Sequence, residues 1–123
     1  ALPQLSGAYV LTLAIECAFP LAIRTLPATR MRPGVYLYCG SAYGPGGLRA
    51  RLARHFRAEK APRWHIDRLT CRAAKCAALI VPGGNECNLA DTLRSRSDLD
   101  MPIPRFGASD CRRCESHLFC LKA

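Results

Sequence analysis

The sequence lacks any apolar run long enough to cross a bilayer, although half of its 123 residues are hydrophobic. A membrane-spanning helix needs about 20 consecutive apolar residues, so no membrane role is expected. The first residues, ALPQLSG, contain neither a basic segment nor an apolar one, so we expect no signal peptide. Internal repeats and low-complexity segments are also missing. A chain of this length is expected to form a single domain over residues 1–123 with its own core.

Acidic residues are scarce: 9 Asp and Glu stand against 18 Lys and Arg, which gives a formal net charge of +9. Most of the basic residues are arginine, whose planar guanidinium suits bidentate contacts to phosphate. Six of these arginines lie between Arg49 and Arg68. The excess could be solvated surface charge alone. Its clustering on a small domain favours a polyanionic partner, and nucleic acid is the usual one.

Cysteine, in contrast, is abundant. An even number of cysteines in a short chain can indicate a disulfide framework in a secreted protein. Because the chain has many other core residues and shows no leader, we expect a cytoplasmic protein with mostly reduced thiols. The eight cysteines are Cys17, Cys39, Cys71, Cys76, Cys87, Cys111, Cys114 and Cys120.

Hydrophobic patterning predicts an α/β (α+β) fold with a small, mostly antiparallel central sheet flanked by helices. Strands are expected over residues 7–15, 21–26, 34–39, 75–81 and 116–123, and helices from about residue 47, over 62–70 and over 85–96. The 75–81 strand is expected to be buried. Leu48, Leu52 and Phe56 recur at helical spacing and are expected to face the core, as are Leu89 and Leu93 in the last helix.

Two residues of the first helix lie beside its apolar stripe. On a helical wheel, Arg51 and His55 lie at the border between the stripe and solvent, where a charged group can reach over the sheet edge. Arg49, Arg54 and Arg57 lie farther round and are expected to be solvated or to steer phosphate. On the helix alone, Arg51 could equally be an ordinary border arginine that extends into water.

Four short motifs follow one another along the chain: GAY at 7–9, YCG at 38–40, LRARLARH at 48–55 and ECNLADTL at 86–93. With these motifs the chain resembles the GIY-YIG endonuclease superfamily. It is most similar to a branch that reads YxGSA-x-G-x-GGL, then WHID, then FGASDC-x-x-C-x-SHL. Members of that branch also occur fused to endonuclease III-type repair glycosylases. The resemblance extends from Gly7 to Leu118.

The resemblance implies a metal-dependent endonuclease that hydrolyses phosphodiester bonds in DNA, with a role in DNA repair. Such hydrolysis needs a base for the water, a cation for the developing charge and a metal ion at the leaving oxygen. Carried over by the resemblance, Tyr9 is the base, Tyr38 a second active-site hydroxyl and Arg51 the phosphate clamp. Glu86 is the ligand of a Mg²⁺ or Mn²⁺ ion. His55 orients a hydroxyl or contacts phosphate.

Contacts to nucleic acid are expected from the glycine-rich loop and from the arginine face of the first helix. Gly40 would let a backbone approach closely, and the Gly46–Gly47 amides at a helix start favour a phosphate. The residues expected to bind nucleic acid are Gly40, Ser41, Gly46, Gly47, Arg49, Arg54 and Arg57.

The sequence also departs from the superfamily pattern. The gap between Gly7 and Tyr38 is longer than usual, and the asparagine found late in many members has no counterpart. Glu86 could also be a plain carboxylate at a helix start. A non-catalytic nucleic-acid-binding module on the same scaffold is therefore the alternative function. His65 in WHID could pack the helix pair or face the cleft, and packing is favoured.

A last pattern, C-x2-C-x2-H-x2-C, contains residue types that ligate zinc: Cys111, Cys114, His117 and Cys120. The spacing is compressed, and a strand over 117–121 would point His117 and Cys120 to opposite faces. Buried thiols are therefore favoured over a structural zinc ion. One disulfide bridge from this tail is the other alternative; its partner would be Cys71, Cys76 or Cys87.

Overall fold

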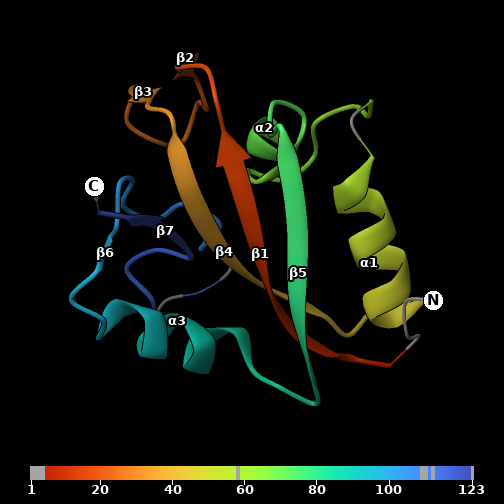
Figure 1. Ribbon diagram of the computed structural model, residues 1–123. Coiled ribbons are helices and arrows are strands. Elements are labelled where there is room, and N and C mark those ends of the chain that lie inside the picture. The colour runs from red at the N-terminus through yellow and green to blue at the C-terminus, as the bar shows by residue number, and fades with distance from the viewer. Residues whose placement is uncertain (1–4, 58, 109–110, 112, 123) are drawn as a thin grey trace.

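The computed structural model describes residues 5–57, 59–108, 111 and 113–122. Residues 109, 110 and 112 of the last motif, and residue 123 of the expected final strand, lie outside this description. The described elements form the expected α/β (α+β) fold (Figure 1). They are β1 (Gly7–Ile15), β2 (Phe19–Leu21), β3 (Thr29–Met31), β4 (Gly34–Ala42), α1 (Gly47–Phe56), α2 (Asp67–Thr70), β5 (Lys75–Pro82), α3 (Glu86–Arg94), β6 (Leu99–Asp100) and β7 (Leu118–Leu121).

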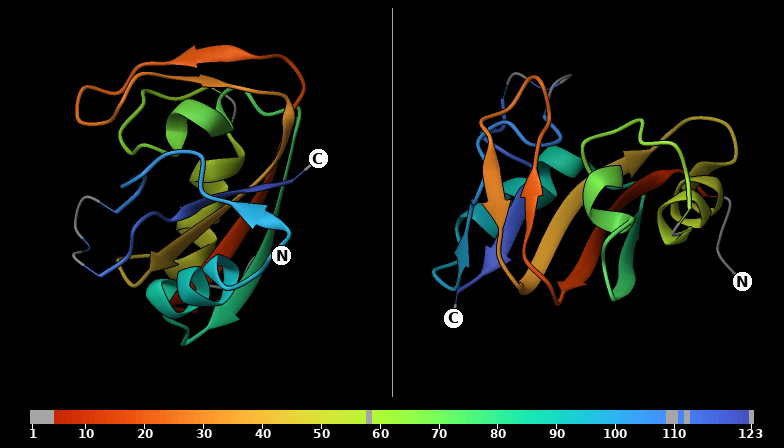
Figure 2. Two further views of the ribbon diagram at one scale, coloured as in Figure 1. Left: turned by 90° about the vertical axis from the view of Figure 1, so that its left-hand side faces the viewer. Right: turned by 90° about the horizontal axis from the view of Figure 1, so that it is seen from above.

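The central sheet has five strands in the order β5-β1-β4-β7-β6, and every neighbouring pair is antiparallel, which confirms the predicted sheet. β1 and β4 pair along their whole length, from Gly7 opposite Ala42 to Ile15 opposite Gly34. This register places Tyr9 opposite Gly40. The short strands β2 and β3 form a separate hairpin, seen along the top of the left view in Figure 2.

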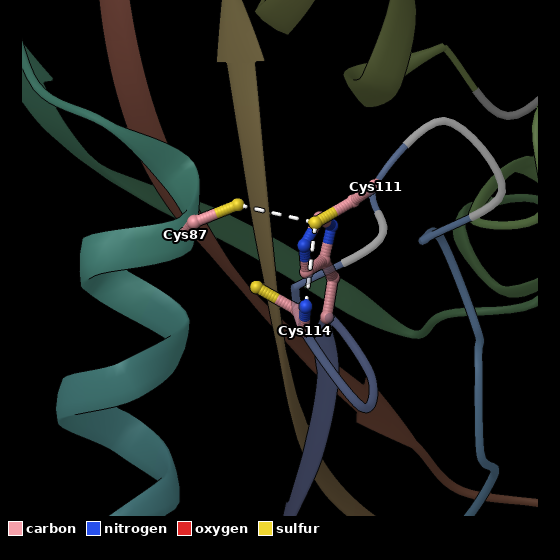
Figure 3. A group of neighbouring side chains, drawn as sticks. Cys87, Cys111 and Cys114 are labelled. Carbon is pink, nitrogen blue, oxygen red and sulfur yellow. Dashed lines mark hydrogen bonds between the residues drawn. The ribbon is translucent and has the colours of Figure 1, made fainter.

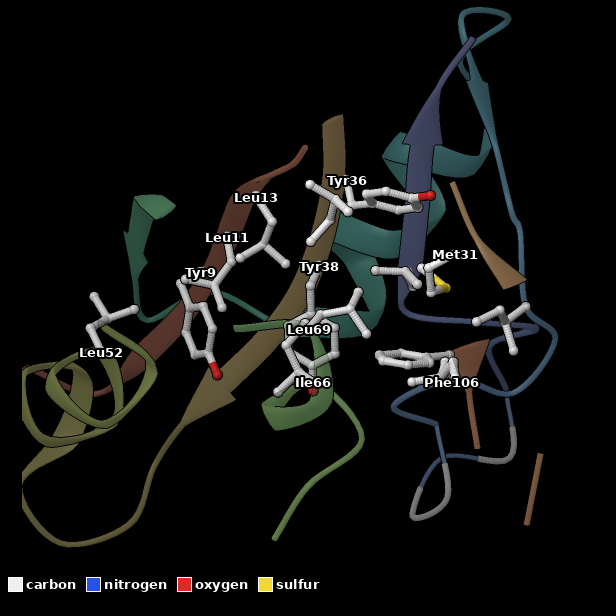
Figure 4. Packing of buried hydrophobic residues seen from close by; sticks show 14 of the residues in the cluster. Tyr9, Leu11, Leu13, Met31, Tyr36, Tyr38, Leu52, Ile66, Leu69 and Phe106 are labelled. Atoms are coloured by element: carbon white, nitrogen blue, oxygen red, sulfur yellow. The ribbon is translucent and has the colours of Figure 1, made fainter. Parts of the chain in front are cut away.

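The two faces of the sheet are covered by different helices. Successive side chains of a strand point to opposite faces. Tyr9 and Leu11 of β1 pack with α1 and α2 in the larger core cluster, part of which is shown in Figure 4. Val10 and Cys39 pack with α3 in a smaller cluster. In Figure 1, α1 lies to the right of the sheet and α3 at its lower left.

The strand expected over 21–26 is wrong. β2 ends at Leu21, and the chain then turns, with the Leu26 N–H donating to the Ile23 carbonyl over 3.0 Å. The strand contains Pro20, which is compatible with an isolated two-stranded ribbon because one side of each strand makes no ladder hydrogen bonds. β3 and β6 were not expected, because three and two residues are too few to give a pattern.

Two expectations about burial are also wrong. The 75–81 strand is an edge strand that pairs only with β1, and Leu79 is 65% exposed. An apolar run does not by itself reveal how many neighbours a strand has. Phe56 is 42% exposed because it is the last residue of α1, and His55 is buried instead. Leu89 and Leu93 pack against the smaller cluster as expected.

The helix expected over 62–70 is reduced to the four residues of α2. The carboxylate of Asp67 accepts the backbone N–H groups of Arg63 and Trp64, at 2.8 and 2.9 Å. These amides are therefore used in a turn before the helix. No helix among the described residues is both long enough and apolar enough to cross a membrane.

Candidate functional site

A cleft of about 340 Å³ lies at the edge of β4. The pairing of β4 with β7 ends at Tyr38 and Leu118, whereas β4 continues to Ala42. Beyond that point the edge of β4 is bordered by loop, with the Cys39 N–H donating to the His117 carbonyl over 2.9 Å. At this part of the β4 edge, side chains from α1 on one face of the sheet and from α3 on the other line the same cleft. The described lining residues are Tyr38, Ser41, Tyr43, Arg51, His55, Arg63, Trp64, His65, Glu86, Gly107, Cys111 and His117.

Tyr9 and His55 form a buried pair beside the cleft. The Tyr9 hydroxyl lies 2.6 Å from Nε2 of His55, and the two residues are 0% and 1% exposed. Burial, reinforced by the Lys60 ammonium, lowers the pKa of His55 to about 3. Burial also raises the pKa of Tyr9, against the opposing effect of the Arg51 guanidinium. The hydrogen bond therefore joins a neutral phenol and a neutral imidazole, and His55 is not the border residue that the wheel predicted.

A glycine packs against each motif tyrosine. A Cβ on Gly40 would lie 2.4 Å from the hydroxyl oxygen of Tyr9. A Cβ on Gly107, whose φ is +69°, would lie 2.6 Å from Cε1 of Tyr38. Gly40 is buried, and the Tyr9 ring fills the space in front of it. The expectation that Gly40 offers its backbone to nucleic acid is therefore wrong.

Arg51 reaches the cleft from α1 and is half-buried. Its guanidinium carbon lies 4.3 Å from the centre of the Trp64 ring, a cation–π distance. Among the described residues Arg51 forms no ion pair. Trp64 and Arg63, whose guanidinium carbon lies 5.4 Å from the same ring, also line the cleft and were not predicted there. The sequence gives no sign that Arg51 and Arg63 stack on Trp64, because this contact depends on how the side chains are arranged in the fold.

Arg54 has a structural partner, so the expectation that it is solvated or steers phosphate is wrong. Its Nη2 lies 2.6 Å from Oδ2 of Asp67, which is 0% exposed. Burial raises the pKa of Asp67, but the hydrogen bonds from Trp64, Arg63 and Arg54 outweigh it and leave the pKa below the ordinary value. Arg49 and Arg57 are exposed on the same helix.

The start of α1 is internally hydrogen-bonded. Gly46 and Gly47 adopt positive φ values of 82° and 59°, which glycine permits. The Gly47 N–H donates to the Gly44 carbonyl over 3.1 Å, and the Leu48 N–H donates to the Leu5 carbonyl over 2.8 Å. The expectation that this pair of glycine amides binds a phosphate is therefore wrong for Gly47. Ser41 does line the cleft.

Glu86, the first residue of α3, faces the cleft from the other side of the sheet edge. The preceding Asn85 caps the helix by accepting the N–H groups of Cys87 and Asn88. Oε2 of Glu86 lies 3.9 Å from Nδ1 of His117, whose pKa is lowered by burial. Glu86 is the only carboxylate among the described lining residues, and one carboxylate completed by water and substrate oxygens is a usual Mg²⁺ site. The residue present thus fits a divalent cation.

His65 also lines the cleft. Its Nδ1 accepts the Gly107 N–H over 2.9 Å, so the ring proton resides on Nε2. Burial lowers the pKa of His65. The residue thus contacts the loop at Gly107 and lines the cleft, the alternative that was not favoured from the sequence.

A cluster of four metal-ligating side chains adjoins the cleft. The ligand atoms of Cys87, Cys111, Cys114 and His117 all lie within 4.8 Å of one another. Figure 3 shows the three cysteine side chains pointing toward one another from α3 and from the C-terminal loop. The predicted set is wrong in one member: Cys120 lies on β7, with its Sγ 3.5 Å from the Leu121 carbonyl, and Cys87 occupies its place. Two ligand groups separated by a longer loop are typical of structural zinc sites, but this spacing does not single out Cys87, because Cys71 and Cys76 also precede Cys111 by a longer loop.

The cysteines of the cluster are not bonded to each other. Sγ of Cys87 lies 3.3 Å from Sγ of Cys111, which exceeds the disulfide length of about 2.05 Å. All eight cysteines are free thiols. The structure thus agrees with reduced thiols and contains none of the expected alternative bridges.

Comparison with known proteins yields one relationship. The model of the family described as Domain of unknown function DUF123 matches residues 8–123. No curated protein and no solved structure matches the chain. Because the matched region covers nearly the whole sequence, the chain belongs to the DUF123 family.

Proposed function

We propose that the chain is a metal-dependent endonuclease that hydrolyses phosphodiester bonds in DNA. The observation that carries the proposal is one cleft lined by Tyr38, Arg51, His55 and Glu86, with Tyr9 hydrogen-bonded to His55. The two basic residues come from α1, Tyr38 comes from β4, and Glu86 comes from α3. These are the residue types that the resemblance to the GIY-YIG superfamily implies, brought together from motifs that span most of the chain.

Arg51 is the residue suited to hold the scissile phosphate. Its charge has no carboxylate partner in the described part of the chain, and its guanidinium carbon lies 4.3 Å from the centre of the Trp64 ring. A positioned guanidinium donates to two phosphate oxygens at once and stabilises the negative charge that develops on them. Arg54 and the exposed Arg63 also lie at this ring, at 4.7 and 5.4 Å from its centre, but Arg54 is paired with Asp67.

The Tyr9–His55 pair is suited to take the proton of the attacking water. As the water oxygen bonds to phosphorus, the Tyr9 oxygen accepts the water proton, and the proton of the Tyr9 hydroxyl passes along the 2.6 Å hydrogen bond to Nε2 of His55. The bond from phosphorus to the leaving oxygen breaks in the same displacement. Tyr38, at the cleft wall, supplies a hydroxyl donor to a phosphate oxygen.

Glu86 would hold the divalent cation, Mg²⁺ or Mn²⁺. Such an ion supplies Lewis acidity at the phosphate oxygens and eases departure of the leaving oxygen. The Asn85 cap fixes the first turn of α3 and so fixes the point from which Glu86 extends into the cleft.

A nicking assay on supercoiled and branched DNA with Mg²⁺ or Mn²⁺ tests the proposal. Arg51→Ala should lower the cleavage rate on the order of a hundredfold or more, about 3 kcal/mol of barrier. Glu86→Gln should abolish the metal-dependent cleavage. Arg57→Ala, on an exposed position of the same helix, is the matched control: it should mainly weaken binding and cut almost as well as wild type at saturating DNA concentration. Circular dichroism verifies that each variant is folded. Wild-type cleavage that Arg51→Ala leaves unchanged would show that the site is assigned wrongly.

A second function, a non-catalytic nucleic-acid-binding module, is favoured by one observation. Tyr9 is 0% exposed, so its hydroxyl meets no solvent in this structure. A wild-type protein that binds DNA in a salt-dependent way, yet cuts no substrate with either metal, would establish this second function.

A further inference from the structure

We propose that Cys87, Cys111, Cys114 and His117 bind one structural Zn²⁺ ion. The site is separate from the cation attributed to Glu86, and its existence does not depend on nuclease activity. Cys87 comes from the first turn of α3, and the other three residues come from the loop that leads into β7. The ion would therefore join two segments that are distant in the sequence.

The distances are close to those of a tetrahedral zinc site. Zinc bonds to sulfur at about 2.3 Å and to nitrogen at about 2.1 Å, which separates the ligand atoms of a tetrahedron by about 3.5–3.8 Å. Here all four ligand atoms lie within 4.8 Å of one another, and the sulfurs of Cys87 and Cys111 are 3.3 Å apart. Small side-chain rotations are enough to close the tetrahedron.

His117 provides an independent sign of a missing partner. The residue is 1% exposed, and both of its ring nitrogens are buried without a hydrogen bond from the described residues. A buried polar atom without a partner costs free energy, so native proteins rarely leave one unsatisfied. Coordination by one ring nitrogen would satisfy that atom.

The loop that carries two of the cysteines is braced from within. The guanidinium of Arg105 donates to the carbonyls of Ala108 and Cys111, both at 2.5 Å, and of Cys114 at 2.7 Å. The Cys114 N–H lies 3.4 Å from Sγ of Cys111, a contact that favours the thiolate form. Hydrogen bonds of this kind orient metal ligands before the ion arrives.

The donor set favours zinc over other ions. Three sulfurs and one imidazole form a Cys₃His set, which is a usual closed site for structural zinc. Magnesium and calcium prefer oxygen ligands, and the cluster contains none. Each thiol loses its proton on binding, so the complex carries one net negative charge. Four protein ligands leave no open position, so the ion would be structural.

The placement has a consequence for the cleft that rests on the proposed function. Glu86 directly precedes Cys87, and both belong to the first turn of α3. An ion on Cys87 would hold that turn against the C-terminal loop and keep the Glu86 carboxylate directed into the cleft. Cys111 and His117 line the same cleft, so the zinc site forms part of its wall.

The experiment is metal analysis of the purified, reduced full chain by inductively coupled plasma mass spectrometry. About one zinc ion per chain is expected, and Cys87→Ser should lose most of it. Cys120→Ser is the matched control, since Cys120 is a half-buried thiol outside the cluster, and it should keep the full content. A wild-type chain without zinc, or one that contains iron instead, would overturn the proposal. Equal zinc loss in Cys87→Ser and Cys120→Ser would overturn the ligand set.

Two further measurements keep the proposal testable if Cys87→Ser does not fold. Cys87→His retains a ligand for zinc and should restore the metal content that serine removes. Replacement of zinc by Co²⁺ in the wild-type protein should give the visible bands of a tetrahedral site and near-ultraviolet thiolate bands. Octahedral Co²⁺ spectra without thiolate bands would contradict the site. A Cys87–Cys111 disulfide in the freshly isolated chain, detected by mass spectrometry without reductant, would contradict it as well. Because none of these readouts uses DNA, a failed zinc site and a failed nuclease proposal are distinguishable.

Discussion

The two faces of the central sheet are packed differently. On the face covered by α1 and α2, 17 buried apolar residues form one cluster among the described residues, whereas the cluster under α3 contains five. The larger cluster continues to the Tyr9–His55 pair, so the core and the cleft share side chains. On the α3 face, the four potential zinc ligands lie between the helix and the C-terminal loop, where the other face has large apolar side chains.

The difference shows how the same small sheet can be covered in two ways. Burial of about 25 cal/mol per Å² of apolar surface suffices where many large side chains meet. Where few meet, the covering element needs another source of stabilisation, and the proposed zinc site would provide it. Three predictions test this contrast and a fourth concerns the exposed arginines of α1; they are given in order of decreasing expected effect.

Removal of zinc should affect the α3 face most strongly. Structural zinc contributes about 10–16 kcal/mol of apparent binding free energy in small zinc peptides, and part of that is expected here. A chelator should accelerate amide hydrogen exchange at Ala90 of α3 while Leu11 of β1 keeps most of its protection. The measurement is hydrogen exchange by mass spectrometry with and without chelator. Equal loss of protection on both faces would mean that the two faces unfold as one unit.

Acid should destabilise the other face through His55. Its pKa is about 3 in the folded chain against about 6.5 in the unfolded chain, so between these values the unfolded chain binds the extra proton. The contribution of neutral His55 to the free energy of unfolding is therefore fully present above pH 6.5. It is lost as the pH falls toward 3, by at most about 5 kcal/mol. Urea unfolding from pH 7 to pH 4 measures the loss.

His55→Gln separates this effect from acid release of zinc, which lowers stability over a similar range because the thiolates take up protons. The variant keeps the zinc ligands and should show a shallower pH dependence than wild type. Identical pH profiles for the two proteins would assign the whole acid effect to the α3 face.

Matched leucine truncations compare the two clusters directly. Leu52 of α1 is 0% exposed in the larger cluster, and Leu93 of α3 is half-buried in the smaller one. Leu52→Ala should cost about 3 kcal/mol of unfolding free energy and Leu93→Ala about 1 kcal/mol, because a fully enclosed cavity is the more costly. Urea denaturation of the zinc-loaded proteins measures both. Equal costs would show that α3 is packed as tightly as α1.

The smallest effect is expected from exposed arginines of α1. If the chain binds DNA, Arg49→Ala with Arg57→Ala should reduce the slope of log K against log[salt] by about 1 for each phosphate that is no longer neutralised. Fluorescence anisotropy at several salt concentrations measures the slope. Arg30→Ala, exposed on the β2–β3 hairpin away from α1, is the control and should leave the slope unchanged.

The sequence predicted those parts of the fold and of the cleft that depend on residues close to one another along the chain. The long strand at 7–15 and the stripe of Leu48 and Leu52 are visible as local periodicity, and both are present in the structure. The burial of His55 was missed, because a wheel places a residue by angle and does not show what covers it. Arg54 was taken as a free cation, since its partner Asp67 lies 13 positions away on another element.

The proposed zinc ligands show the same limit more clearly. Cys111, Cys114 and His117 were recognised because they are neighbours in sequence, and Cys120 was included for the same reason. Cys87 belongs to another element, 24 positions before Cys111, and only the fold of α3 against the C-terminal loop brings them together. Which distant cysteine completes a set depends on packing that a single sequence does not contain.

Gly40 and Tyr9 have a consequence for how such chains can diverge. The two residues face each other across the β1–β4 ladder, and no side chain fits at position 40 while the Tyr9 ring is in place. The glycine that ends YCG and the tyrosine that ends GAY are therefore sterically dependent on each other, because the tyrosine ring needs the space that the glycine leaves. Replacement of Tyr9 by a smaller residue would allow larger side chains at position 40. Replacement of Gly40 by alanine while Tyr9 is present would displace the Tyr9 hydroxyl from His55. A relative with a larger residue at position 40 is therefore expected to lack the tyrosine at position 9 as well.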